Sequence, residues 1–257
     1  MGHVRLSRLP QTRKWQEVVA LLGSDNLSVK QLAEASANAA NQMLRNTSKD
    51  PVLNEILKLL SLIPRAAKGT NFQDAMHKLG INVKNNPTLI EIAQAFANRI
   101  NSFIKEKNHI RSDLGEMAKH SAIATILGKV AENSAQLWNA TPDDIKHGLG
   151  KLAAPGRFGD LVQGFYTDLT QRLLRYYLDR ELPKHIAPGK AISSIQDKRA
   201  FDQALEKHCR ESTFIMRAFA NDWYGKTYSE DAVIDSKKAT GFNYIASNKI
   251  ANELTKR

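Results

Sequence analysis

Apolar side chains recur at steps of three and four residues along most of this chain, which is the spacing of one face of an α-helix. The pattern is clearest in the second half, where one apolar stripe runs from Phe158 to Tyr176 and another from Phe201 to Trp223. Segments that alternate apolar and polar residues, as half-buried strands do, are nearly absent. The sequence therefore predicts an all-α fold.

Signals that begin helices support this prediction. Ser28 and Gln31 have the spacing of a capping box, while Asp50, Asn86 and Thr141 each precede a proline that suits the first helical turn. We expect these helices to pack as an orthogonal or bundle-like array. Stripes and caps together predict about nine helices and a short final one, at roughly 13–22, 29–45, 51–63, 72–79, 87–107, 113–138, 142–153, 158–182, 196–224 and 243–255.

Two parts of the N-terminal half resemble each other. A glycine stop, a helix cap, several alanines and two asparagines recur in the same order. This order predicts a duplicated three-helix unit, and convergence of two alanine-rich amphipathic helices is the alternative. The aligned segments are 15–23 with 72–80 and 28–44 with 88–104, which gives copies at about 15–69 and 72–139.

Composition divides the chain into three parts. Residues 1–14 form a basic arm without acidic residues, and 15–140 hold the duplicated half. Most aromatic residues lie beyond Arg157, and the glycines and prolines of 148–156 are typical of a connection. The third predicted part is therefore a long-helix half at 141–257, which ends in an aromatic tail.

The chain carries a net charge of +11, about a third of which lies in the arm. A basic excess favours polyanions, because cations on the protein neutralise phosphates and release their counterions. Ordinary surface charge is the alternative. Polar faces of the two repeat helices and lysines among the tail aromatics are further candidate contact points. The residues proposed to bind nucleic acid or a partner are Arg5, Arg8, Arg13, Lys14, Asn38, Asn41, Asn98, Asn101, Lys237 and Lys238.

Catalytic and cofactor motifs do not withstand a residue-by-residue test. Gly225-Lys226-Thr227 resembles the end of a phosphate-binding loop, but Ala220 stands where that loop needs a glycine. The single cysteine, Cys209, excludes an internal disulfide and is expected to be a small buried hydrophobe. We predict no catalytic residue, no metal site and no cofactor from these motifs.

Two classes of function follow. The preferred one is a non-enzymatic helical binding protein, a subunit or accessory factor of a larger assembly, with a protein partner and some nucleic-acid affinity. The alternative is an enzyme whose site is assembled between the two halves from His185, His208 and the arginines of 172–180. The longest apolar run is too short to span a bilayer and the N-terminus lacks a signal peptide, so we expect a cytoplasmic protein without membrane contact. The oligomeric state stays open.

Overall fold

The computed structural model describes residues 3–4, 13–24, 28–108, 111–132, 140–154, 156–186, 188, 190, 192–230 and 234–256. These residues are nearly all helical, which confirms the all-α prediction. A pairing of two residues per strand joins β1 (His3–Val4) to β2 (Arg111–Ser112) in parallel. The helices are α1 (Arg13–Gly23), α2 (Val29–Ala39), α3 (Asn41–Thr47), α4 (Pro51–Lys68), α5 (Phe72–Lys78), α6 (Leu89–Glu106), α7 (Asp113–Glu132), α8 (Pro142–Lys151), α9 (Arg157–Glu181), α10 (Ile195–Thr213), α11 (Ile215–Glu230) and α12 (Ser236–Lys256), with one 3-10 turn, η1 (Leu182–Lys184).

The predicted count of about nine helices is not confirmed. The described residues form twelve α-helices, because two of the predicted helices are each divided in the structure. The predicted helix 29–45 is interrupted at Ala40, and the predicted helix 196–224 is interrupted at Phe214. The final helix is also longer than predicted, since it begins at Ser236.

Local capping explains where several helices begin. Ser28, Thr88 and Thr141 each close a capping box with the side chain three residues later, and Asp50 accepts hydrogen bonds from the first backbone amides of α4. The start predicted at Asn86 is wrong, because Thr88 is the residue that caps α6. Gly80 has a φ of 74°, a backbone conformation that glycine adopts without a steric penalty, and it ends the segment after α5 as predicted.

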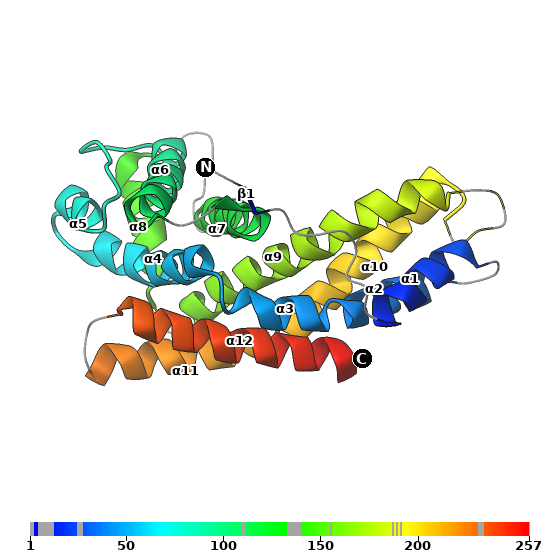
Figure 1. Cartoon of the computed structure of the whole chain (residues 1–257). Helices are drawn as coiled ribbons and strands as arrows, with labels where there is room; N and C mark the ends of the chain where they lie inside the picture. The colour runs from blue at the N-terminus through cyan, green and yellow to red at the C-terminus, as the bar shows by residue number, and fades with distance from the viewer. Residues whose placement is uncertain are drawn as a thin grey trace.

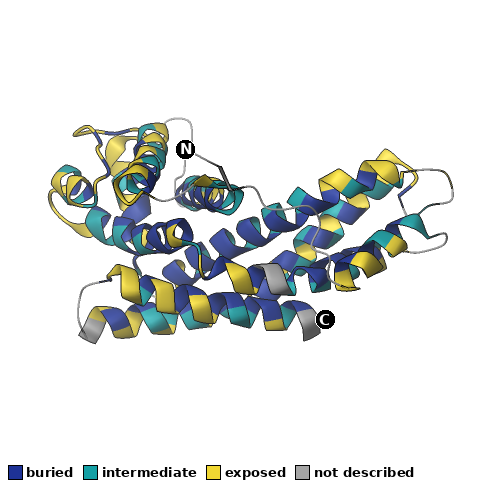
Figure 2. Cartoon of the chain, in the orientation of Figure 1, coloured by how far each residue is buried: buried dark blue, intermediate teal, exposed yellow. Residues whose placement is uncertain are grey.

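The helices form two packed groups. The groups contact each other where α9 packs on α7 and where α12 packs on α4. In one group α2 packs between α1 and α10, and α10 also packs on α9 and α12. In the other group α4 packs against α5, α6, α7 and α8. Figure 1 shows the first group as an elongated bundle and the second as a cluster of helices at one end of it. A single apolar cluster extends from Trp15 to Leu254 and so runs through both groups (Figure 2).

The duplicated three-helix unit is not confirmed. In the first expected copy the long helix is broken at Ala40, whereas α6 in the second copy is continuous over 18 residues. Their partners also differ, since α2 packs on α1 and α10 while α6 packs on α7 and α4. Among the helices of the described segments, none contains a stretch long and apolar enough to cross a membrane.

The C-terminal helix α12 is held against α3, α4 and α9 by a buried polar network. Asn243, which is fully buried, donates to Asn54 at 2.8 Å and accepts a hydrogen bond from the Tyr166 hydroxyl at 3.0 Å. The hydroxyls of Thr47 and Ser247 lie 3.0 Å apart in the same network. Phe242 stacks on Phe219 of α11, with ring centroids 5.0 Å apart. The aromatic residues of the predicted tail therefore lie on two helices, α11 and α12, which pack on each other and on the body of the protein.

Candidate functional site

The residues of the predicted basic arm are only partly within the described segments. Arg5 and Arg8 lie outside them. Arg13 and Lys14 are exposed in the first turn of α1, and Arg13 makes an exposed ion pair with Glu17 at 3.1 Å. An exposed pair of this kind contributes little to stability, so Arg13 remains available to an anionic partner.

Asn41 does not face outward as the sequence suggests. Its amide donates to the backbone carbonyl of Ala251 at 2.7 Å, and its carbonyl oxygen accepts a hydrogen bond from Arg45 at 2.8 Å. Arg45 in turn donates to Asn248 and Asn252 of α12. The polar face of α3 is therefore occupied by the C-terminal helix of the same chain. Asn38 is half-buried, and its Oδ1 is enclosed without a hydrogen-bond partner among the described residues.

The second pair of asparagines has local partners on a different part of the molecule. Asn98 is exposed and accepts a hydrogen bond from Gln94, while Asn101 accepts one from Lys119 of α7. The tail lysines lie in the first turn of α12, where Lys237 is exposed and Lys238 is half-buried. The predicted contact residues thus lie on helices that pack on different partners, and they do not form one defined site.

The residues nominated for an enzyme also lie apart. His208 Nε2 is 3.8 Å from the Glu34 carboxylate between α10 and α2, whereas His185 follows η1 and lies beside Gly23. Arg172 pairs with Asp168, and the Arg180 guanidinium lies over the Tyr176 ring. Cys209 is buried as predicted, and this burial raises the pKa of its thiol to about 12. That thiol is protonated at neutral pH and is not an activated nucleophile.

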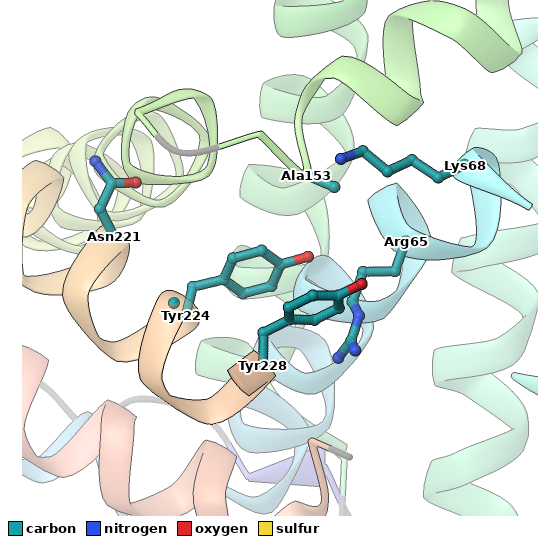
Figure 3. Close-up of a pocket in the computed structure, with 7 residues that line it drawn as sticks. Arg65, Lys68, Ala153, Asn221, Tyr224 and Tyr228 are labelled. Carbon is teal, nitrogen blue, oxygen red and sulfur yellow. The ribbon is translucent and has the colours of Figure 1, made fainter. Parts of the chain in front are cut away.

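A cavity of about 380 Å³ lies where the C-terminal end of α4, the segment that follows α8 and the helix α11 meet (Figure 3). We call it the Arg65–Tyr228 cavity. Its volume lies in the range of small-molecule sites, and more of its lining is apolar than polar. The lining residues are Arg65, Lys68, Ala153, Asn221, Tyr224, Gly225 and Tyr228.

One wall of the cavity is aromatic. Tyr224 and Tyr228 lie one helical turn apart on α11 and point toward α4 (Figure 3), with ring centroids 6.5 Å apart. Tyr224 is buried and stacks on Phe158 of α9 at 4.0 Å, so its ring is fixed in place. Burial also raises the pKa of Tyr224, which keeps its hydroxyl neutral. Tyr228 is 57% exposed and is the aromatic side chain that a ligand would meet.

The opposite wall is cationic. Arg65 and Lys68 lie in the last turn of α4, and the Arg65 guanidinium sits over the Tyr228 ring at 4.3 Å. Arg65 Nη1 is buried and has no hydrogen-bond partner among the described residues. Neither side chain makes an ion pair with a described carboxylate, and no acidic residue is among the described residues that line the cavity. An anionic group in the cavity would therefore meet cationic donors without competition from a described carboxylate in the lining.

Asn221 connects the cavity to the first turn of α9. Its side-chain oxygen accepts a hydrogen bond from the Gly159 backbone amide at 2.7 Å. This bond fixes which end of the amide is the acceptor, and the Asn221 nitrogen packs beside Gly159, on the side away from the two tyrosines (Figure 3). The lining therefore offers hydrogen-bond donors from Arg65 and Lys68.

Two other hollows differ in charge. A groove of about 450 Å³ between α7 and α9 holds Asp113, Glu116, Asp168 and Asp179 together with Arg172 and Arg175. A groove of about 510 Å³ along α9 mixes acids and bases that pair with each other, such as Arg210 with Glu206 and Arg217 with Asp160. No group of described residues has the make-up of a metal site. Unlike these two grooves, the Arg65–Tyr228 cavity has cations and no carboxylate among the described residues of its lining.

Comparisons with protein-family models, with curated proteins and with solved structures give no match to this chain. The functional argument therefore depends on the cavity alone. Sequence reasoning noted Tyr224 and Tyr228 among the tail aromatics but missed Arg65 and Lys68. The signal for these two was a basic last turn of a helix without neighbouring acids, which is also the usual way to complement a helix dipole.

Proposed function

We propose that this chain is a non-enzymatic binding protein, acting as a subunit or accessory factor of a larger assembly, and that it takes an anionic group in the Arg65–Tyr228 cavity. The observation that carries this proposal is the pair of cations Arg65 and Lys68 in a cavity whose described lining holds no carboxylate. The Coulomb attraction between a ligand anion and Arg65 is strengthened here, because the half-buried wall lowers the effective dielectric constant.

The chemistry of the lining supports binding rather than catalysis. No described lining residue is a histidine, carboxylate or thiol, so general-base or nucleophilic chemistry would depend on Lys68 or a tyrosine. The tyrosine hydroxyl with a fixed position, that of Tyr224, has a raised pKa and is directed to the Ser61 carbonyl at 3.4 Å. The net charge of +11 adds a long-range attraction for polyanions.

Binding of mixed DNA and RNA fragments at several salt concentrations tests the proposal. The double variant Arg65→Ala with Lys68→Ala removes the cationic wall, and we expect weaker binding and a salt slope that is smaller by about 1 to 2. The matched control is Lys105→Ala with Lys107→Ala, which removes the same charge from exposed positions at the end of α6. If the cavity variant and the control weaken binding equally, only net charge matters and the proposed site is refuted.

A further inference from the structure

We propose that the ligand of the Arg65–Tyr228 cavity is a nucleotide unit, whose base stacks on Tyr228 and whose phosphate lies between Arg65 and Lys68. This inference rests on the proposed function and adds the chemical class of the ligand. It follows from two features that the cavity combines: an accessible aromatic ring and a pair of cations without carboxylate partners among the described residues.

The aromatic feature favours a planar group. Tyr228 exposes more than half of its side chain, and the Arg65 guanidinium stacks against its ring. Every nucleobase has a π-face, and stacking on an aromatic side chain does not depend on the identity of the base. A simple anion such as phosphate would leave this ring surface in water, so a planar ring joined to the anion fits the cavity better.

The cationic feature places the phosphate. Arg65 and Lys68 are three residues apart on α4 and therefore lie on one side of the helix, where both contribute to the cavity wall. Arginine and lysine are the side chains that bind phosphates, and arginine also stacks on planar rings. In the proposed complex Arg65 contacts both parts of a nucleotide, the ring through its face and the phosphate through its guanidinium donors.

Stacking on Tyr228 needs a base whose face is accessible. The face and edges of a nucleobase become accessible when the base is unpaired and unstacked. Because base pairing and stacking would block the approach of Tyr228, the ligand is a single nucleotide or a single strand and not a duplex.

Two further cations lie beside the cavity in the chain. Lys151 and Arg157 are exposed on either side of Ala153, which lines the cavity, and neither makes an ion pair with a described carboxylate. They would meet the phosphates of neighbouring nucleotides in a strand. A free mononucleotide has the same base and phosphate as one unit of a strand. The test below distinguishes a strand from a free mononucleotide as the ligand.

The test measures binding of a labelled single-stranded oligonucleotide by fluorescence polarisation, with the full chain and two variants. Tyr228→Leu removes the ring but keeps an apolar side chain, and we expect binding to weaken by roughly tenfold to a hundredfold. Tyr244→Leu is the matched control, since Tyr244 is similarly exposed on α12, and it should bind as the wild type does. Unchanged helical circular dichroism excludes unfolding of either variant.

Three ligands complete the design: a duplex of the same sequence, an abasic strand of the same length, and a mononucleotide as competitor. We expect the duplex and the abasic strand to bind more weakly than the base-containing strand. Competition by the mononucleotide would identify a free nucleotide as the source, and its failure would identify a strand. An abasic strand that binds as tightly as the normal strand, or a Tyr228→Leu variant that binds normally, overturns the nucleotide inference. If binding then still depends on Arg65 and Lys68, the proposed function survives that result.

Discussion

The close approach of α9 and α11 at Gly159 determines both the stability of the bundle and the position of Asn221. A methyl group added at Gly159 would overlap the Arg217 carbonyl oxygen and the Asn221 side chain. The backbone oxygen cannot move without shifting α11. At Gly128, near the C-terminal end of α7, the same methyl group would meet no described atom within 4 Å. The same substitution, glycine to alanine, therefore tests the packing at both positions, and the expected change in the free energy of unfolding has opposite signs at the two.

The expected magnitudes follow from three terms. Overpacking costs about 1–3 kcal/mol, and loss of the hydrogen bond from the Gly159 amide to Asn221 costs about 1 kcal/mol. The higher helix propensity of alanine offsets about 0.5–1 kcal/mol of this. Gly159→Ala should therefore destabilise the protein by about 2–3 kcal/mol, while Gly128→Ala, which has only the propensity term, should stabilise it by about 0.5–1 kcal/mol.

Thermal unfolding followed by circular dichroism measures both variants. For a chain of this size the expected change is a Tm lower by roughly 5–10 °C for Gly159→Ala and higher by roughly 1–3 °C for Gly128→Ala. The Gly159 variant should also bind the oligonucleotide less well, because Asn221 and the wall of the Arg65–Tyr228 cavity are displaced. A Gly159→Ala protein as stable as the wild type would refute the close approach of the two helices.

Two other predictions concern buried groups. Asn243→Ala should destabilise the protein by about 2–4 kcal/mol, since the Tyr166 hydroxyl and Asn54 lose their buried partner. The control, Asn248→Ala at the exposed Arg45 contact, should cost less than about 0.5 kcal/mol. Chemical denaturation measures the free energy of unfolding of both variants, and equal losses would count against the buried network. Burial raises the pKa of Cys209 to about 12, so the unfolded chain loses this proton at a lower pH than the folded protein does. The stability contributed by the protonated thiol is therefore lost as pH rises above about 8.5, by roughly 1.4 kcal/mol per pH unit, and a Cys209→Ala variant should lack this part of the decline in a comparison of unfolding at pH ~8 and pH ~10.

Much of the fold could be predicted because its signals are local. Caps such as Ser28 and Thr141 act on amides within three residues, and apolar stripes show which face of each helix is buried. The breaks at Ala40 and Phe214 have no such signal, because neither residue is a glycine or a proline, and alanine is the best helix former. The flanking helices have different partners, α2 packing mainly on α10 and α3 on α12. A break of that kind is set by tertiary packing, which the sequence pattern does not contain.

The candidate site could be predicted only in part for a similar reason. Tyr224 and Tyr228 are one helical turn apart, so their proximity is a local property. The cavity also needs Arg65 and Lys68, which are more than 150 residues distant in the chain and reach it only because α4 and α11 converge. Nothing in the spacing of these residues indicates that convergence.

The fate of the asparagine-rich face shows why unpaired charge is a better guide to a site than polarity. The face of Asn41 and Arg45 looked like a contact surface, and it is one, but its partner is α12 of the same chain. Polar side chains on a helix can be satisfied internally, as this face is, so their presence does not imply an external ligand. Arg65 and Lys68 differ in this respect, because the described lining of their cavity holds no carboxylate that would neutralise them. The binding hypothesis therefore depends on Arg65 and not on the more numerous polar residues that the sequence displays.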